Sequence, residues 1–188
     1  RALEGIPISI KDLLFTKGVR TTSGSLLFKD FVPEYDSIAV ERARKAGVVI
    51  LGKTNSPEFG LSGTTENRLG EACRNPWDTS RTTGGSSGGA AAAIAAGLCS
   101  LSIGSDGGGS IRIPASFCGL YGLKPTRGRV PRHGGIGGWP LFSTVGPMTS
   151  TVKDSALLLQ VLSGPDRRDT TCIQEDPPDF LGALEKGI

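Results

Sequence analysis

Apolar and polar positions follow two alternating periods along the first third of the chain, which predicts strands and helices in turn. Residues 6–10 form a short apolar run that predicts a strand, with Lys11 and Asp12 at its carboxyl end. Residues 37–46 carry alanines at helical spacing, and residues 48–51 are a second apolar run typical of a buried strand. Helix-to-strand units of this kind build parallel sheets. The pattern therefore indicates an α/β protein.

The remainder of the chain continues this alternation, with long loops between the elements. We expect further helices at residues 90–96, 111–117 and 152–162, and further strands at 98–103 and 119–124. Segments rich in Gly, Pro, Asn and Thr predict loops at 54–83 and 125–149 and an exposed linker at 165–179. Structureless loops as long as the first of these are uncommon unless they are functional.

Composition changes this picture mainly through glycine, which supplies 28 of the 188 residues. The glycines gather at 84–89, 104–109 and 134–138, so they indicate special backbone geometry at a few places rather than a flexible chain. We expect a site where these segments meet.

Charge and hydropathy exclude several classes of protein. The net charge of +3 is spread along the chain without a basic block, which gives direct nucleic-acid binding no support. The longest apolar run, residues 90–98, is far shorter than the ~20 residues of a membrane span, and no signal peptide is recognised, so we expect a cytoplasmic protein. The four cysteines form no C-x-x-C pair, so we expect buried thiols rather than a zinc site or a disulfide framework.

The sequence GGSSGG at residues 84–89 precedes the expected helix at 90–96. It lacks the lysine of a phosphate-binding Walker loop and the spacing of a dinucleotide fingerprint. A tight turn at a helix N-terminus favours developing negative charge, as in oxyanion chemistry. A plain glycine-rich helix entry is the alternative.

A second small-residue segment, residues 104–110, ends in Ser110. Three glycines before a serine allow consecutive amides to point at one oxyanion. Asp106 and Arg112 flank this loop and could lock it by an ion pair, with substrate contact as the alternative. The segment therefore predicts a nucleophile beside a cradle of backbone donors.

The base for such a serine has few candidates. His133 is the one histidine and has no evident triad partner, which argues against a Ser-His-Asp hydrolase. A lysine can act instead if burial lowers its pKa from about 10.4. Lys11, at the end of an apolar strand, is placed for this, although an exposed strand terminus would look the same in sequence.

These segments together resemble the amidase signature family. The resemblance rests on GGSSGG at 84–89 and GSDGGGSIRIPA at 104–115. Shorter matches are GIPISIKD at 5–12, GKTNSPE at 52–58, GLKPT at 122–126 and GPM at 146–148. The motifs span nearly the whole chain in the family's order. The resemblance implies a central mixed, largely parallel β-sheet flanked by helices on both faces, truncated at both ends. It also implies a partial catalytic core at 1–164, with a linker and the start of a C-terminal half at 165–188.

The resemblance also implies the roles of individual residues. Ser110 would be the nucleophile, Ser86 the proton relay after a cis bond, and Lys11 the base. The backbone of Gly107, Gly108, Gly109 and Ser110 would form the oxyanion hole, supported by Asp106, Arg112, Gly85 and Ser87. No metal or organic cofactor is implied. Gly107 departs from the family, whose members commonly carry threonine or a branched residue there, and this departure bears on the rigidity of the hole.

The expected function is hydrolysis of a small-molecule carboxamide through a seryl acyl-enzyme. Within the family, the alternative is the glutaminase subunit of a tRNA-dependent amidotransferase, which needs a partner subunit. The segment 127–140 is more similar to stand-alone amidases. A non-catalytic binding domain of the same fold is the alternative from another class, and homodimerisation is left open. The substrate is not readable, since the family's acyl pocket also draws on its C-terminal half.

Overall fold

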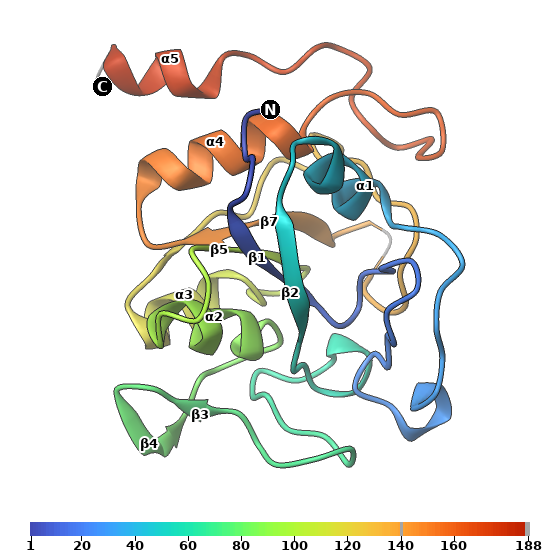
Figure 1. Ribbon diagram of the computed structural model, residues 1–188, viewed down its shortest axis with the longest axis vertical. Helices are drawn as coiled ribbons and strands as arrows, with labels where there is room; N and C mark the ends of the chain where they lie inside the picture. Colours follow the sequence, from blue (N-terminus) through green and yellow to red (C-terminus); the bar gives the residue numbers. More distant parts are fainter. Residues whose placement is uncertain (140, 187–188) are drawn as a thin grey trace.

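A five-stranded mixed sheet with helices on both faces organises the chain in a computed structural model that describes residues 1–139 and 141–186 (Figure 1). The strand order is β2-β1-β5-β7-β6. The strands are β1 (Pro7–Lys11), β2 (Val49–Thr54), β5 (Leu101–Asp106), β6 (Tyr121–Gly122) and β7 (Thr144–Thr149). Strand β1 pairs in parallel with β2 and β5, whereas β7 is antiparallel to β5 and β6. Only β7 runs against the others, so the expected mixed, largely parallel sheet is confirmed.

The helices divide between the two faces of the sheet. They are α1 (Ile38–Lys45), α2 (Gly88–Ala95), α3 (Arg112–Cys118), α4 (Val152–Leu162) and α5 (Phe180–Glu185). Helices α1 and α4 pack on one face and α2 and α3 on the other, while α5 packs against α4. Single turns of 3-10 helix lie at Leu26–Phe28 and Glu58–Gly60.

Alternation along β1 sends its side chains to two different environments. Ile8 and Ile10 are fully buried in the core that contains α1 and α4. Ser9 and Lys11 lie on the opposite face, because successive side chains of a strand alternate. That is the face covered by α2. Lys11, at the end of this strand, is therefore covered by α2 instead of being exposed to solvent.

Two strand regions were not predicted. The expected loop at 54–83 contains a small hairpin, β3 (Arg74–Asn75) and β4 (Asp78–Thr82). The expected loop at 125–149 contains the fully buried strand β7. Gly146 and Pro147 weaken a strand by local preference, but pairing on both sides overrides that preference here. Pro140, within the same expected loop, lies outside the described residues.

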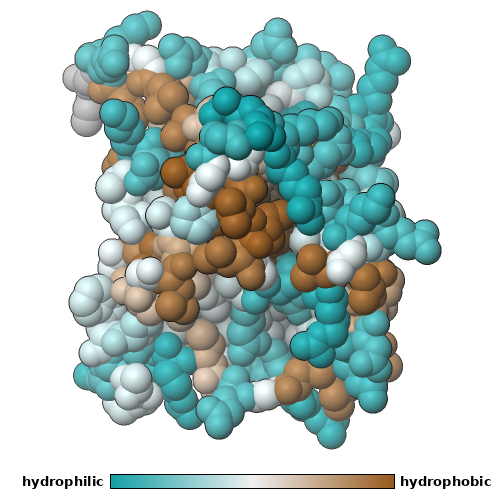
Figure 2. All heavy atoms as spheres, viewed as in Figure 1, coloured by the Kyte–Doolittle hydropathy of each residue, from teal (hydrophilic) through white to brown (hydrophobic). Residues whose placement is uncertain are grey.

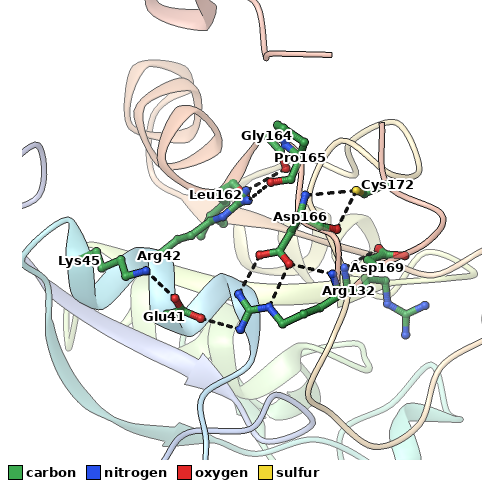
Figure 3. Close-up of polar contacts among 11 residues, drawn as sticks. Glu41, Arg42, Lys45, Arg132, Leu162, Gly164, Pro165, Asp166, Asp169 and Cys172 are labelled. Carbon is green, nitrogen blue, oxygen red and sulfur yellow. Dashed lines mark hydrogen bonds and ion pairs between the residues drawn. The ribbon is translucent and has the colours of Figure 1, made fainter. Parts of the chain in front are cut away.

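The expected linker is attached to the core over its first part (Figure 3). The Arg42 guanidinium on α1 donates to the carbonyl oxygens of Leu162 at 2.7 Å, Gly164 at 3.1 Å and Pro165 at 2.9 Å. Asp169 is buried and accepts a hydrogen bond from the amide of Arg132 at 2.7 Å. Residues 187 and 188, at the end of the same expected segment, lie outside the described part of the chain.

Edge strand β2 exposes apolar side chains on the surface. Figure 2 shows hydrophobic surface at the centre of the view, over edge strand β2. Val49 and Leu51 of this strand are exposed. Within the described residues, no other strand pairs with the outer side of β2.

Candidate active site

Three predicted site residues come from three different elements and meet at one end of the sheet. Lys11 ends β1, Ser86 lies in the turn before α2, and Ser110 lies between β5 and α3. Ser86 and Ser110 both line a pocket of about 180 Å³. The carboxyl ends of parallel strands are where α/β sheets present functional groups. The structure therefore brings together residues that lie up to a hundred positions apart in sequence.

Lys11 is the most deeply buried of the three residues. Its side chain is fully inaccessible, and its Nζ donates to Ser86 Oγ at 2.7 Å and to the Ser105 carbonyl at 3.3 Å. Burial lowers the pKa of Lys11 from 10.5 to about 7, although the negative charge of Asp106 acts to raise it. A large fraction of Lys11 is consequently neutral at physiological pH, and a neutral amine can accept a proton.

The turn that carries Ser86 is built by close backbone approach. A methyl group at Gly85 would lie 2.7 Å from the Thr64 carbonyl oxygen, and one at Gly89 would collide with the backbone amide of Asn55. The Gly85–Ser86 peptide bond is cis. Helix α2 begins at Gly88, two residues earlier than expected, so the end of the glycine run is already helical.

Ser87 connects this turn to the neighbouring segment. Its amide donates to the Ser110 carbonyl at 3.0 Å, and its hydroxyl donates to the Ser105 carbonyl at 3.2 Å. No hydrogen bond joins the hydroxyls of Ser86 and Ser110 among the described residues. The segments that carry Ser86 and Ser110 are thus joined by the backbone bond from Ser87 to Ser110.

Asp106 organises the loop that leads to Ser110. Its carboxylate accepts amide bonds from Gly109 at 2.7 Å and Ile111 at 3.1 Å, and a two-pronged contact from Arg112 at 2.9 and 3.0 Å. Burial acts to raise the pKa of Asp106, but the bonds from Arg112 and from the amides outweigh it and hold that pKa below its ordinary value. The ion pair expected from the sequence is therefore present, and it fixes the loop.

One member of the expected donor cradle is already engaged. The amide of Gly109 points to Asp106, so it is not free to bind a ligand in this conformation. The amides of Gly107, Gly108 and Ser110 have no hydrogen-bond partner in the part of the chain that the structure describes. The sequence could not reveal this, because three successive glycines look equivalent until the acceptor of each amide is known.

Other pocket residues carried no signal in the sequence analysis. Phe59 and Leu61, from the segment after β2, line the pocket, and so do Trp139 and Ser143 from the loop before β7. Phe59 adopts a left-handed backbone with φ of 52°, which is uncommon outside glycine and concentrates at functional sites. Its position just after the GKTNSPE match was the one available clue.

A buried ion pair joins Asp12, the residue after Lys11, to Lys53 on the neighbouring strand β2. Lys53 Nζ is 3.6 Å from an Asp12 carboxylate oxygen and donates to the Leu14 carbonyl at 2.6 Å and the Thr21 hydroxyl at 2.8 Å. Burial lowers the pKa of Lys53 to about 8, against the opposing influence of Asp12. These bonds fix the chain as it leaves β1 and hence fix the end of the strand that carries Lys11.

A larger pocket of about 400 Å³ adjoins the first one. The two share Leu13, Ser105, Gly138 and Ser143 in their walls. The larger pocket alone has ionisable side chains in its lining, from Arg127, Arg132, His133 and Asp169.

The described residues contain no cluster of His, Cys, Asp and Glu side chains for a metal ion, no helix able to span a membrane and no paired cysteines. None of their His, Cys, Asp and Glu side chains form a group of three or more that could hold a metal ion. None of the described helices is long and apolar enough to cross a membrane. The four cysteines are free, and three of them are buried as expected.

The chain belongs to the amidase family, whose model, described as Amidase, matches residues 1–186. One relative is a glutamyl-tRNA(Gln) amidotransferase subunit of Nitratidesulfovibrio vulgaris (strain DP4), which is 53% identical over 184 residues. That match covers 98% of this chain and 38% of the relative. The corresponding subunit of Prochlorococcus marinus (strain MIT 9303) is also 53% identical, with the same coverage.

Solved structures give the same family. A protein from a vestigial complex that reveals the origins of an s-triazine catabolic enzyme matches with a TM-score of 0.96 and 41% identity, covering 100% of this chain and 41% of its own. The peptide amidase of Stenotrophomonas maltophilia matches with a TM-score of 0.85 and 38% identity, covering 97% and 39%. The chain thus spans about two fifths of the length of the relatives it matches.

Proposed function

We propose that this chain carries the catalytic core of an amidase that hydrolyses a carboxamide bond through a seryl acyl-enzyme. The observation that carries the proposal is the 2.7 Å contact between the fully buried Lys11 Nζ and the Oγ of Ser86, which lines one pocket with Ser110. Family membership supports the same chemistry. A serine is a weak nucleophile unless a neighbouring base takes its proton, and a desolvated lysine is such a base.

The proposed first step is proton transfer and attack. Neutral Lys11 takes the proton of Ser86, Ser86 takes the proton of Ser110, and Ser110 Oγ bonds to the amide carbonyl carbon. The Ser86–Ser110 bond forms when substrate closes the pocket, as hydrogen bonds of catalytic groups often tighten only in the complex. The amides of Gly107, Gly108 and Ser110 then donate to the oxyanion, and each such donor typically contributes about 2.7–4 kcal/mol.

The proposed second half releases both products. The carbon–nitrogen bond breaks as Ser86 returns a proton to the leaving nitrogen, so ammonia or an amine departs and an ester remains on Ser110. Water then attacks this ester by the same relay and releases the carboxylic acid. The chemistry uses no metal or cofactor. Asp106 and Arg112 serve it indirectly, by holding the loop between β5 and α3 in place.

The test is substitution of Ser110 in the full-length protein. Ser110→Ala should abolish ammonia release from a panel of simple amides and prevent labelling by a fluorophosphonate probe, while Ser80→Ala in exposed strand β4 should change neither. Unchanged hydrolysis by Ser110→Ala would refute the proposal. Absence of labelling in the wild-type protein would favour a non-catalytic binding domain.

A second candidate function is glutaminase activity within an amidotransferase. It is favoured by the amidotransferase relatives, among them the subunits of Nitratidesulfovibrio vulgaris and Prochlorococcus marinus, each 53% identical to this chain. In that case ammonia release would require L-glutamine and a co-purified partner subunit. Hydrolysis of simple amides by the isolated full-length protein would decide for the stand-alone amidase.

A further inference from the structure

Trp139 lies over the loop that carries the proposed nucleophile. It lines the same pocket as Ser86 and Ser110, and a methyl group at Gly108 would lie 3.6 Å from its Cζ3 atom, which is van der Waals contact. Trp139 is 55% exposed, which leaves it accessible to a ligand. Phe142 supports it edge-on, with ring centroids 6.4 Å apart at 85°.

The backbone of Trp139 is held from below by Ser143. The Ser143 hydroxyl accepts the Trp139 amide at 2.7 Å, and the Ser143 amide donates to the Trp139 carbonyl at 2.8 Å. A methyl group at Gly107 would lie 2.7 Å from that hydroxyl. The absence of a side chain at Gly107 thus provides the space in which Ser143 anchors Trp139.

A further contact extends this anchoring to the core. Arg132 donates from its guanidinium to the Ser143 carbonyl at 3.3 Å, while its own amide is bound by buried Asp169. The segment attached by Arg42 in Figure 3 therefore also stabilises the loop that carries Trp139. Hydrogen bonds to the rest of the fold therefore hold the loop that carries the Trp139 ring.

The rest of the pocket is uncharged, and its polar side chains are those of serines. Among the described residues that line it, none has an ionisable side chain, and the large side chains are those of Leu13, Phe59, Leu61, Ile113 and Trp139. An amino-acid amide that stayed within this pocket would find no ionic partner for its ammonium and carboxylate, because the ionisable side chains line the adjoining pocket. An aromatic or other apolar group would gain contact area against these walls.

We infer that Trp139 determines the specificity for the acyl group and selects uncharged amides whose acyl group is aromatic. Gly107 and Ser143 are the residues that position Trp139. This inference rests on the proposed amidase function. The leaving nitrogen has to lie toward Ser86 to receive its proton, whereas Trp139 contacts Gly108 of the oxyanion loop. The indole accordingly faces the acyl side of the amide, where a planar ring can stack on it.

The experiment compares benzamide with acetamide in the full-length enzyme. Trp139→Ala should lower kcat/KM for benzamide about tenfold, mainly through KM, and lower that for acetamide much less, because only the larger acyl group reaches the ring. Trp139→Phe should retain most of the benzamide activity. Ser143→Ala should lower the benzamide-to-acetamide ratio of kcat/KM. Trp77→Ala, which removes the second tryptophan from a position that lines neither pocket, is the matched control.

Two outcomes would overturn the inference: equal losses for both amides in Trp139→Ala, or unchanged kcat/KM for benzamide. Failure of the proposed function is separated by calorimetry. Benzamide binding to the Ser110→Ala protein needs no turnover, and adding Trp139→Ala should weaken it about tenfold. Equal dissociation constants in the two proteins would reject the role of Trp139 whatever the catalytic outcome.

Discussion

Lys11 Nζ lies 2.7 Å from Ser86 Oγ, and both side chains are shielded from solvent. Such a contact serves two states of the lysine. The charged amine donates to the serine, and the neutral amine accepts its proton. Burial brings the pKa of Lys11 to about 7, where both states are populated.

The first prediction concerns the pH dependence of turnover. The neutral form of Lys11 is the proposed base, so kcat/KM should rise by about tenfold per pH unit below pH 7 and level off above it. A pH series with a neutral amide measures this. If the rising limb instead lay above pH 10, Lys11 would have an ordinary pKa and the proposed base would be wrong.

The second prediction concerns stability and the same side chain. The pKa of Lys11 is 10.5 in the unfolded chain and about 7 in the folded one, so between these values the unfolded chain binds more protons and the free energy of unfolding rises with pH. Lys11→Met should weaken this rise and add roughly 2–4 kcal/mol of stability at pH 7, because no charge then has to be desolvated. Denaturant unfolding at pH 7 and pH 9 measures both effects.

Two comparisons make that result specific. Lys45→Met, at an exposed position of α1, should leave the pH dependence as it is. The buried Lys53, whose pKa is lowered to about 8, should account for the slope that remains in Lys11→Met. A Lys11→Met protein with the wild-type slope would contradict the assignment.

The third prediction concerns the space between Gly107 and Ser143. Gly107→Ala places a methyl group 2.7 Å from the Ser143 hydroxyl, and overpacking of this kind typically costs about 1–3 kcal/mol. We expect lower stability and lower kcat. Combining it with Ser143→Gly should recover kcat for acetamide, since the colliding hydroxyl is gone. Additive losses in the double variant would show that the two residues do not compete for this space.

The fourth prediction concerns Arg42. Arg42→Met removes three hydrogen bonds to the carbonyls of Leu162, Gly164 and Pro165, and should lower the free energy of unfolding by roughly 2–3 kcal/mol. Hydrogen exchange should quicken in residues 165–172 before it does in the sheet. Lys45→Ala removes only an exposed ion pair with Glu41 and should change stability by less than about 0.5 kcal/mol.

Local pattern was sufficient for much of the fold. Strand β1, helix α1 and helix α4 follow from apolar periodicity and their end signals, and the structure has them within a residue or two of the predicted bounds. Strand β7 could not be predicted in this way. Its glycine and proline are unfavourable in isolation, and the strands that stabilise it, β5 and β6, lie well before it in the sequence.

Some residues of the candidate site could be predicted from sequence motifs, whereas others could be found only in the folded structure. Lys11, Ser86 and Ser110 stand in recognisable motifs, so the sequence could nominate them before any geometry was known. Trp139 and Phe59 stand in segments without periodicity, and only the folded chain places them in the pocket. The engagement of the Gly109 amide by Asp106 is a matter of hydrogen-bond direction, which residue types alone do not encode.

Edge strand β2 has a consequence for any protein that contains this sheet. Its outer side offers backbone donors and acceptors next to the exposed Val49 and Leu51, and such an edge is a template for another strand. Where further polypeptide covers it, that cover contributes directly to solubility. Where nothing does, two copies can pair edge to edge, and self-association would then compete with folding as the concentration rises.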